Sequence, residues 1–339
     1  MTYRTAVIGC GGVSRFHTRA YLANPAVRTV GACDPDEKAR TRYAEEFRID
    51  ALFADAAEML DKLRPDIVSI CAPNPAHAQL TILAAAKGVK GIVCEKPMAM
   101  TLPEADAMLQ ACKSSGARLI VSHQRRFEQA FMKAKELLDS GAIGKLLRME
   151  ALIGDWDLMS WGTHWLDVFR FYNNDCPTEW VFGQVETRDP KRFFGHQVER
   201  SGLAEIRYAN GVEAVYQGGD VAHGMGNRLF GTDGVIEVEP LCPDGIGGPI
   251  RLLNAASGGW RIIDIRNEDH VQQPFVRMIA TFIECIETGR RHPLEGESAR
   301  EVLAQIIAIY ESSRSRRVVG FPVEIDDNPF LAMLEGGSQ

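Results

Sequence analysis

The chain has 339 residues, of which 45% are hydrophobic and 24% are charged, and its formal net charge is −7. This length and composition are sufficient for two folded domains with sizeable cores. The acidic balance and the lack of a basic stripe argue against a nucleic-acid partner. No apolar stretch is long enough to cross a bilayer, and an apolar run near the first residue leaves no room for a signal peptide. We therefore expect a cytoplasmic protein that binds neither nucleic acid nor membranes.

Eight cysteines are spread along the chain without a CxxC pair or a Cys/His cluster at metal-ligand spacing. Four of them fall near the ends of early apolar runs, where a small side chain packs well. We predict buried free thiols and no metal site. The cysteines occupy positions 10, 33, 71, 94, 112, 176, 242 and 285.

A glycine-rich turn follows the first apolar run of the chain. The run, residues 5–8, leads into Gly9-Cys10-Gly11-Gly12-Val13-Ser14 and then into a helical pattern. Gly9 permits a tight turn, and Gly11 allows the backbone to approach a pyrophosphate that the helix N-terminus attracts. Ser14 takes the place of the third small residue of this kind of motif. We predict a dinucleotide site that includes Gly9, Gly11, Gly12 and Val13.

The second apolar run, residues 27–33, ends at Asp34. An acidic residue about 20 positions beyond the turn suits the ribose 2′-hydroxyl of NAD and repels the 2′-phosphate of NADP. The pattern thus favours NAD over NADP. The alternative interpretation is that Asp34 only begins the turn Asp34-Pro35-Asp36.

Strand and helix patterns alternate over the first third of the sequence, which is typical of a parallel sheet with helices on both faces. In such a sheet, ligands bind outside the carboxyl ends of the strands. The residues expected there, besides the glycine turn and Asp34, are Ala72, Pro73, Asn74, Glu95, Lys96 and Gln124. His77 is expected either near this crevice or on the surface of its helix.

The triplet Glu95-Lys96-Pro97 directly follows the apolar run 91–94. A lysine at the carboxyl end of a strand reaches into the ligand crevice, where its ammonium group can stabilise negative charge on oxygen. We therefore interpret Lys96 as a catalytic lysine.

The pattern changes in the second half of the chain, where short alternating segments indicate a mostly antiparallel sheet. Asn210-Gly211, between two such segments, is a strong hairpin signal. We predict an α/β protein, with a Rossmann-type, doubly wound parallel sheet in residues 1–123 and an α+β domain with a large open sheet in residues 124–339. The open face of that sheet favours a homodimer or homotetramer formed by sheet packing.

His164 and Asp167 lie three residues apart on a predicted helix, so their side chains share one face. A histidine titrates near neutral pH and can accept the proton of a hydroxyl group while hydride leaves the same carbon. Ser160 is the expected N-cap of this helix. The alternative is a structural histidine in the core and a solvated aspartate on the helix surface.

These motifs resemble those of the Gfo/Idh/MocA family of oxidoreductases, named for glucose–fructose oxidoreductase and inositol dehydrogenase. The resemblance covers nearly the whole chain. Besides the glycine turn and Asp34, it is carried by residues 72–77, 93–97, 124–127, 162–167, 297–313 and 317–322.

The resemblance implies that the protein oxidises a secondary alcohol of a sugar, sugar derivative or cyclic polyol with NAD, or reduces the matching ketone. Lys96 would then hold the reacting oxygen, and His164 would act as the general acid or base. Asp167 would orient a neighbouring hydroxyl or the imidazole. NAD itself supplies the hydride chemistry.

One position departs from the family pattern. Members that oxidise inositol or sugars commonly carry an aspartate four residues before the histidine, where this chain has Ser160. Ser160 can donate or accept a hydrogen bond but carries no charge to balance Lys96. We expect Asp157 to supply that carboxylate. The alternative is a lysine that loses its proton more readily.

Aromatic and polar side chains around the histidine are further candidates for substrate contacts. Tryptophan faces suit the C–H faces of sugar rings, and indole N–H groups can bond to hydroxyls. These candidates are Arg126, Trp156, Trp161, His223 and Asn227. Trp156 and Trp161 are alternatively core aromatics, which is the interpretation we prefer for Trp165.

Other functions stay open on the sequence alone. One is a regulator that binds the dinucleotide without turnover, and another is a reductase of aromatic dihydrodiols or tetrapyrroles on the same scaffold. Retention of Lys96 and His164 argues against the regulator, and the polar segment 155–167 favours a hydroxyl-rich substrate. A third is an enzyme that holds its cofactor tightly and recycles it between two sugars.

Overall fold

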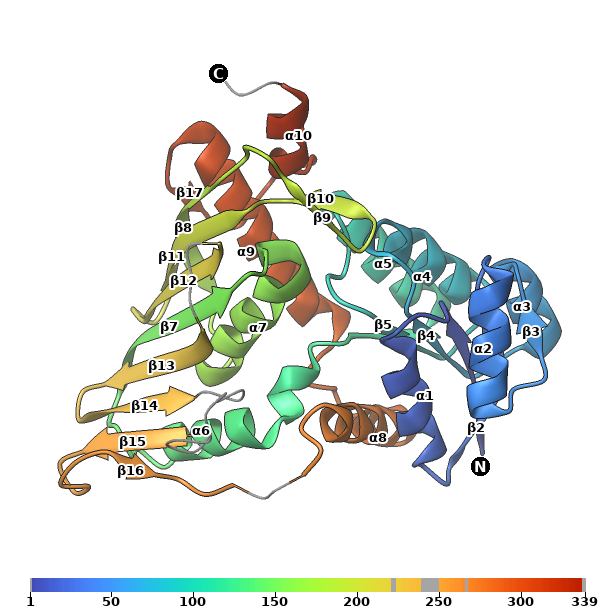
Figure 1. Cartoon of the computed structure of the whole chain (residues 1–339), viewed down its shortest axis with the longest axis horizontal. Coiled ribbons are helices and arrows are strands. Elements are labelled where there is room, and N and C mark those ends of the chain that lie inside the picture. The colour runs from blue at the N-terminus through green and yellow to red at the C-terminus, as the bar shows by residue number, and fades with distance from the viewer. Residues whose placement is uncertain (1, 221–223, 239–249, 266–267, 337–339) are drawn as a thin grey trace. The chain divides into compact units, whose positions relative to one another are not determined.

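Figure 1 shows the computed structural model, which describes residues 2–220, 224–238, 250–265 and 268–336. The chain divides into two compact units. The first consists of Met1–Gln124 and Asp269–Glu301, and the second of Arg125–Glu268 and Val302–Gln339. Among the described helices, none is long and apolar enough to span a membrane. His223 and Cys242 lie outside the described residues.

A six-stranded parallel sheet forms the centre of the first unit, with the strand order β3-β2-β1-β4-β5-β6. The strands are β1 (Tyr3–Ile8), β2 (Val27–Cys33), β3 (Leu52–Phe53), β4 (Ile67–Ile70), β5 (Gly91–Cys94) and β6 (Arg118–Val121). The helices between them are α1 (Ser14–Leu22), α2 (Glu37–Phe47), α3 (Ala56–Leu63), the short 3-10 helix η1 (Asn74–Ala76), α4 (His77–Ala86) and α5 (Leu102–Ser115). The order reverses beside β1, which confirms the predicted doubly wound sheet.

The central strands of this sheet are buried on both faces. Consecutive residues of β1, Ala6 and Val7, are inaccessible, and so are Ile92 and Val93 of β5. Continuous apolar strands of this kind are typical of parallel sheets that helices cover on both sides. Because all six strands run in the same direction, the residues that follow β1, β4 and β5 meet at one edge of the sheet.

A later segment, residues 269–301, also belongs to the first unit. It contains α8 (Gln272–Thr288) and the start of α9 (Gly296–Ser315). α8 packs on α1, where the rings of Phe16 and Phe275 stack with centroids 5.3 Å apart. A division of the chain at residues 123 and 124 therefore needs this segment added to its first part.

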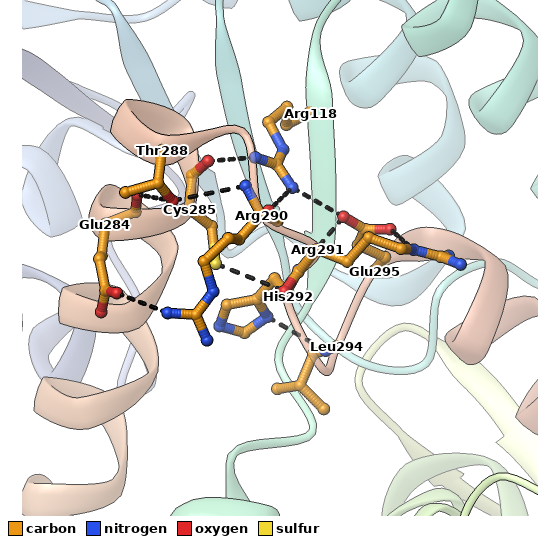
Figure 2. Close-up of polar contacts among 9 residues, drawn as sticks. All are labelled: Arg118, Glu284, Cys285, Thr288, Arg290, Arg291, His292, Leu294 and Glu295. Atoms are coloured by element: carbon orange, nitrogen blue, oxygen red, sulfur yellow. Dashed lines mark hydrogen bonds and ion pairs between the residues drawn. The ribbon is translucent and has the colours of Figure 1, made fainter.

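Arg118, at the start of β6, holds the turn between α8 and α9 (Figure 2). Its guanidinium donates to the carbonyl oxygens of Cys285 and Arg290 and pairs with Glu295 at 2.8 Å. Glu295 also forms a β-bridge with Ile120. The edge strand of the sheet is thus covered by a segment that lies far from it in the sequence, which protects its unpaired backbone groups.

A nine-stranded sheet forms the second unit, with the order β16-β15-β14-β13-β7-β12-β11-β8-β17. All neighbouring strands are antiparallel except β7 and β12. The strands are β7 (Leu146–Gly154), β8 (Thr178–Val185), β11 (Ser201–Tyr208), β12 (Glu213–Gly219), β13 (Met225–Gly231), β14 (Gly234–Val238), β15 (Ile250–Asn254), β16 (Arg261–Ile262) and β17 (Val319–Gly320). A separate hairpin consists of β9 (Lys191–Phe193) and β10 (His196–Val198).

Helices cover one face of this sheet (Figure 1). They are α6 (Gln129–Asp139), α7 (Thr163–Tyr172) and the later part of α9, while η2 (Gln124–Phe127) and α10 (Pro329–Glu335) flank them in the sequence. On the covered face, Val181 and Ile206 are inaccessible. On the other face, Phe182 and Leu203 are 47% and 54% exposed. The predicted large and mostly antiparallel open sheet is therefore confirmed, and oligomers formed through its open face stay a prediction.

The turn at Asn210-Gly211 joins β11 to β12 as an antiparallel hairpin, as predicted. Gly218 and Gly219 end β12, and β13 begins at Met225.

Candidate functional site

The glycine turn after β1 lies at the carboxyl edge of the parallel sheet. Gly9 has a φ of +95°, and a Cβ placed on it would lie 2.5 Å from the carbonyl oxygen of Cys71, so this position requires glycine. A Cβ on Gly11 or Gly12 would meet no described atom within 4 Å. Val13, the N-cap of α1, supplies no side-chain hydrogen bond. The open backbone and the first N–H groups of α1 therefore fit a pyrophosphate.

Asp34 lies beside this turn, directly after β2. One carboxylate oxygen accepts the N–H of Cys10 at 2.8 Å, and the other accepts the N–H of Asp36 at 2.9 Å. The contact with Asp36 is the local turn that the sequence offered as an alternative. The contact with Cys10 in addition places the carboxylate at the glycine turn. The two interpretations of Asp34 are therefore compatible, and ribose binding stays a prediction.

Glu95 is buried and bonds to the helix that follows the glycine turn. Its carboxylate contacts His17 Nε2 at 2.8 Å, and His17 Nδ1 contacts the hydroxyl of Ser69 at 3.0 Å. Burial raises the pKa of Glu95, but the hydrogen bond and charge of His17, followed by the charge of Lys96, outweigh burial and lower that pKa. Glu95, the residue before Lys96 in the chain, therefore carries a negative charge. Sequence reasoning missed His17, although it lies on the buried face of α1.

His77 begins α4 and is fully buried, which excludes a position on the helix surface. Its two ring nitrogens contact the carbonyl oxygens of Pro97 at 2.8 Å and Ala72 at 2.9 Å. Burial lowers the pKa of His77, although both carbonyl oxygens favour the protonated ring. His77 therefore connects Ala72, two residues after β4, to the loop that carries Lys96.

The other predicted cofactor residues of the first unit differ in their accessibility. Pro73 is exposed, Ala72 and Gln124 are half-buried, and Asn74 is buried. Asn74 begins η1, and Gln124 begins η2. Their contacts with a cofactor stay a prediction.

The segment before α7 is a π-helix, η3 (Leu158–Gly162). Asp157 is its N-cap, and a carboxylate oxygen of Asp157 accepts the N–H of Ser160 at 2.7 Å. The predicted N-cap role of Ser160 is therefore wrong, because Ser160 lies inside η3 and the cap is three residues earlier. π-Helical turns are rare overall, and those that occur often lie at functional sites.

The predicted residues of this segment are buried to different degrees. Asp157, Ser160 and His164 are at most 2% exposed, whereas Trp161 is half-buried. The carboxylate of Asp157 already stabilises the backbone of η3. A direct contact of Asp157 or Ser160 with a substrate stays a prediction.

A cluster of aromatic rings in the second unit contacts His164 through Trp161. Trp161 meets His164 edge to face at 5.8 Å and packs on Trp156 at 4.9 Å between ring centroids. The guanidinium of Arg125 lies 5.1 Å from the ring of Trp161 and 5.2 Å from the ring of Trp165, a cation–π arrangement that the sequence did not reveal. Trp165 is fully buried, which confirms it as a core residue.

Asp167 lies on α7 one turn after His164 and is paired with Arg126. Arg126 Nε and Nη2 each donate to a carboxylate oxygen of Asp167 at 2.8 Å, and Arg126 also bonds to Asp175. Burial lowers the pKa of Arg126, but the charges of Asp167 and Asp175 outweigh it and raise that pKa. Asp167 is 1% exposed, so it is not a solvated surface aspartate. The two predicted side chains thus fix the helix that carries His164.

Asn227 lies on β13, and its Nδ2 donates to the carbonyl oxygen of Glu150 at 3.3 Å. The cysteines within the described ranges are free thiols, of which all but the half-buried Cys176 are buried. Over the same ranges, no group of His, Cys, Asp and Glu side chains could hold a metal ion.

Comparisons with known proteins agree with this architecture. The model of the GFO/IDH/MocA oxidoreductase family with an NAD-binding Rossmann fold matches residues 3–123, and the model of the GFO/IDH/MocA C-terminal domain matches residues 131–237. D-apiose dehydrogenase from Paraburkholderia graminis is 28% identical over 94% of this chain and 89% of its own length. The scyllo-inositol 2-dehydrogenase (NAD(+)) of Bacillus subtilis is 24% identical over 95% of this chain and 96% of its own.

A solved structure of levoglucosan dehydrogenase in complex with NADH shares the fold. Its TM-score is 0.85 at 22% sequence identity, and the alignment covers 96% of this chain and 100% of that one.

Proposed function

Because the chain belongs to the Gfo/Idh/MocA family of oxidoreductases, we propose that it uses NAD to oxidise a secondary alcohol of a sugar, a sugar derivative or a cyclic polyol, or to reduce the matching ketone. One observation carries the proposal. The open glycine backbone before α1 and the lysine after β5 lie at the same edge of one parallel sheet. The names of the relatives, which are dehydrogenases of apiose and inositol, support this class of substrate.

The residues of the first unit would bind and orient the cofactor. NAD, when bound, supplies the acceptor or donor of the hydride. Gly9, Gly11, Gly12 and Val13 would hold its pyrophosphate, and Asp34 would accept a hydrogen bond from the ribose 2′-hydroxyl. A 2′-phosphate would be repelled by the same carboxylate. This repulsion supports NAD over NADP as the cofactor.

Lys96 and His164 would act on the reacting hydroxyl group. The ammonium of Lys96 would stabilise negative charge on the oxygen, and Glu95, the residue before it, carries a buried carboxylate. His164 would accept the hydroxyl proton during oxidation and return it during reduction. Asp167, bound by Arg126, would position α7 for this step.

The substrate would be recognised by the segment around η3. Trp161 and Trp156 offer half-buried rings that suit the C–H face of a sugar. Asp157, whose carboxylate caps η3, would supply the negative charge that Ser160 lacks.

A substrate scan tests this function. The purified protein is mixed with polyols, aldoses and ketosugars, each with NAD or NADP, and the absorbance of reduced nicotinamide is followed. We expect turnover with at least one hydroxyl-rich substrate and a loss of about 100-fold or more in kcat/KM for Lys96→Ala and for His164→Ala. Lys62→Ala, which removes an exposed lysine, serves as the control.

Two outcomes would contradict the proposal. Binding of NAD without turnover of any substrate would favour the regulator. Turnover that is unchanged in both variants would remove Lys96 and His164 from the mechanism.

A further inference from the structure

A second acidic residue, Glu199, is buried beside η3. It directly follows β10 and is 1% exposed. Its Oε1 accepts the N–H of Leu158 at 2.6 Å, and its Oε2 contacts the hydroxyl of Tyr310 of α9 at 2.8 Å. Asp157 binds the N–H of Ser160 in the same turn. Two buried carboxyl groups thus hold the backbone of one π-helix.

Two tyrosine hydroxyls belong to the same cluster. Tyr216 of β12 is fully buried, and its Oη would lie 2.7 Å from a Cβ on Gly162, the last residue of η3. Burial, followed by the charges of Glu199 and Asp157, raises the pKa of Tyr216 and of Tyr310 well above the usual value. Both hydroxyls therefore keep their protons. Asp157 before η3, Tyr216 of β12 and Tyr310 of α9 are titratable groups that interact electrostatically with Glu199.

Two carboxylate charges close together in a buried place are unfavourable, and one proton on the pair removes this repulsion. Burial first, and then the negative charge of Asp157, raises the pKa of Glu199 to about 8. A protonated Glu199 keeps both of its contacts. Its Oε1 accepts the N–H of Leu158 and its Oε2 accepts the O–H of Tyr310, and a carboxyl group has further lone-pair sites for the proton.

We propose that Asp157 and Glu199 share one proton at neutral pH, and that this protonated pair positions η3 and, through η3, His164. Glu199 is then a positioning residue that acts through the backbone. When the pH rises, the O–H bond of Glu199 breaks and its proton passes to water. The two buried carboxylates, which bind N–H groups of the same turn, then repel each other, and η3 loosens. The effect on His164 rests on the proposed function, whereas the shared proton and the loosening of η3 do not.

Hydrogen exchange measured by mass spectrometry tests the shared proton directly. Peptides that cover residues 157–164 are followed from neutral to alkaline pH, with correction for the intrinsic exchange rate. We expect the corrected exchange of this turn to rise on the order of tenfold per pH unit as the pH approaches the pKa of Glu199, and to level off above it. In Glu199→Gln, which keeps the acceptor oxygen but cannot ionise, this rise should be missing.

The matched control is Glu186→Gln, the same substitution at a glutamate after β8 whose pKa the hydrogen bonds from Arg188 lower to about 2. It should keep the rise seen in the unmodified protein. A rise that persists in Glu199→Gln, or that is missing in the unmodified protein, would overturn the proposal.

A second variant keeps the test decisive if Glu199→Gln does not fold. Asp157→Asn retains an N-cap side chain but removes the charge that opposes ionisation of Glu199. The midpoint of the exchange transition should move to lower pH, and an unchanged midpoint would count against the pair.

Measurements of turnover test the positioning of His164 by η3 separately from the shared proton. In the unmodified protein, kcat should fall with the same midpoint as the exchange transition, and this fall should be missing in Glu199→Gln. An exchange transition without a matching fall in kcat would leave the shared proton in place and overturn the role of η3 in positioning His164.

Discussion

Each unit buries a glutamate close to a proposed catalytic residue, and the two glutamates differ in the direction of their pKa shift. Glu95 in the first unit is 5% exposed, and Glu199 in the second is 1% exposed. The pKa of Glu95 lies below its usual value and that of Glu199 lies above it. Burial raises both, so the partner makes the difference: His17 contacts Glu95, and Asp157 acts on Glu199.

Burial alone therefore does not set the charge of an acidic side chain. The first unit holds a fixed negative charge next to Lys96 at all pH values near neutrality. The second unit holds a proton that alkaline pH can remove. The sensitivity of the protein to alkaline pH should therefore come from the second unit.

The largest expected effect concerns stability at different pH values. An unfolded glutamate titrates at about 4.3, while the pKa of folded Glu199 is about 8. Between these values the folded state holds a proton that the unfolded state has released, so the free energy of unfolding should fall by several kcal/mol as the pH rises. In urea unfolding across this pH window, the free energy of unfolding of Glu199→Gln should fall less steeply with pH than that of the unmodified protein. An equal dependence of the free energy of unfolding on pH in the variant and the unmodified protein would show that Glu199 does not hold a proton in the folded state.

Glu95 should behave in the opposite way. Its pKa is lowered, so its contribution to stability is complete above the unfolded value and is lost only as the pH falls through the folded value. His17→Ala should leave the buried carboxylate without its ring partner and cost about 3 kcal/mol or more near neutral pH, measured by urea unfolding. The control is Arg15→Ala on the same helix, because Arg15 forms a half-exposed ion pair with Glu46 and such pairs contribute about 1 kcal/mol or less. An equal cost for both variants would show that the contact with His17 does not stabilise Glu95.

One glycine from each unit, Gly11 and Gly162, should respond differently to substitution, because a Cβ on Gly11 meets open space and one on Gly162 meets a packed side chain. Gly162→Ala brings a Cβ to 2.7 Å from the hydroxyl of Tyr216 and should cost about 1–3 kcal/mol in thermal or urea unfolding. This cost should be smaller when Tyr216→Phe removes that hydroxyl. Gly11→Ala should change stability by about 0.5 kcal/mol or less but weaken the binding of NAD, because a Cβ there fills the open side. A stability loss at Gly11 equal to that at Gly162 would contradict this distinction.

The smallest effect is expected for the choice of cofactor. Asp34→Ala removes the carboxylate that would bind the ribose and repel a 2′-phosphate. The preference for NAD over NADP in kcat/KM should fall roughly tenfold, because a hydrogen bond to a charged group contributes on the order of 1.5 kcal/mol. Asp50→Ala, at an exposed aspartate of the same unit, is the control. An unchanged preference would leave Asp34 with its turn contacts only.

Much of the fold follows from local patterns in the sequence. The alternation of apolar runs and helices in the first unit leaves few alternatives to a parallel sheet. In the second unit, Asn210-Gly211 directly marks the hairpin of β11 and β12. The hairpin of β9 and β10 was missed because strands of three residues are too short to show alternation. The π-helix was missed because it depends on a distant residue, Glu199, which binds the N–H of Leu158.

The residues of the candidate site could likewise be predicted only in part. Lys96 and His164 could be selected from the sequence, since each belongs to a short motif. Their supporting residues could not, because the contact of His17 with Glu95 spans 78 positions and that of Leu158 with Glu199 spans 41. Whether a buried acid meets a base or another acid is decided by tertiary packing, which no local pattern records.

The β9–β10 hairpin pairs with itself and not with the nine-stranded sheet. It nevertheless reaches the aromatic cluster, because the ring of Phe193 lies 5.4 Å from that of Trp156. Substitutions at its tip, where Phe194 is 52% exposed, would leave the hydrogen bonds of the large sheet intact. The hairpin is therefore a place where substrate preference could diverge during evolution, or be redesigned in the laboratory, while the sheets stay the same.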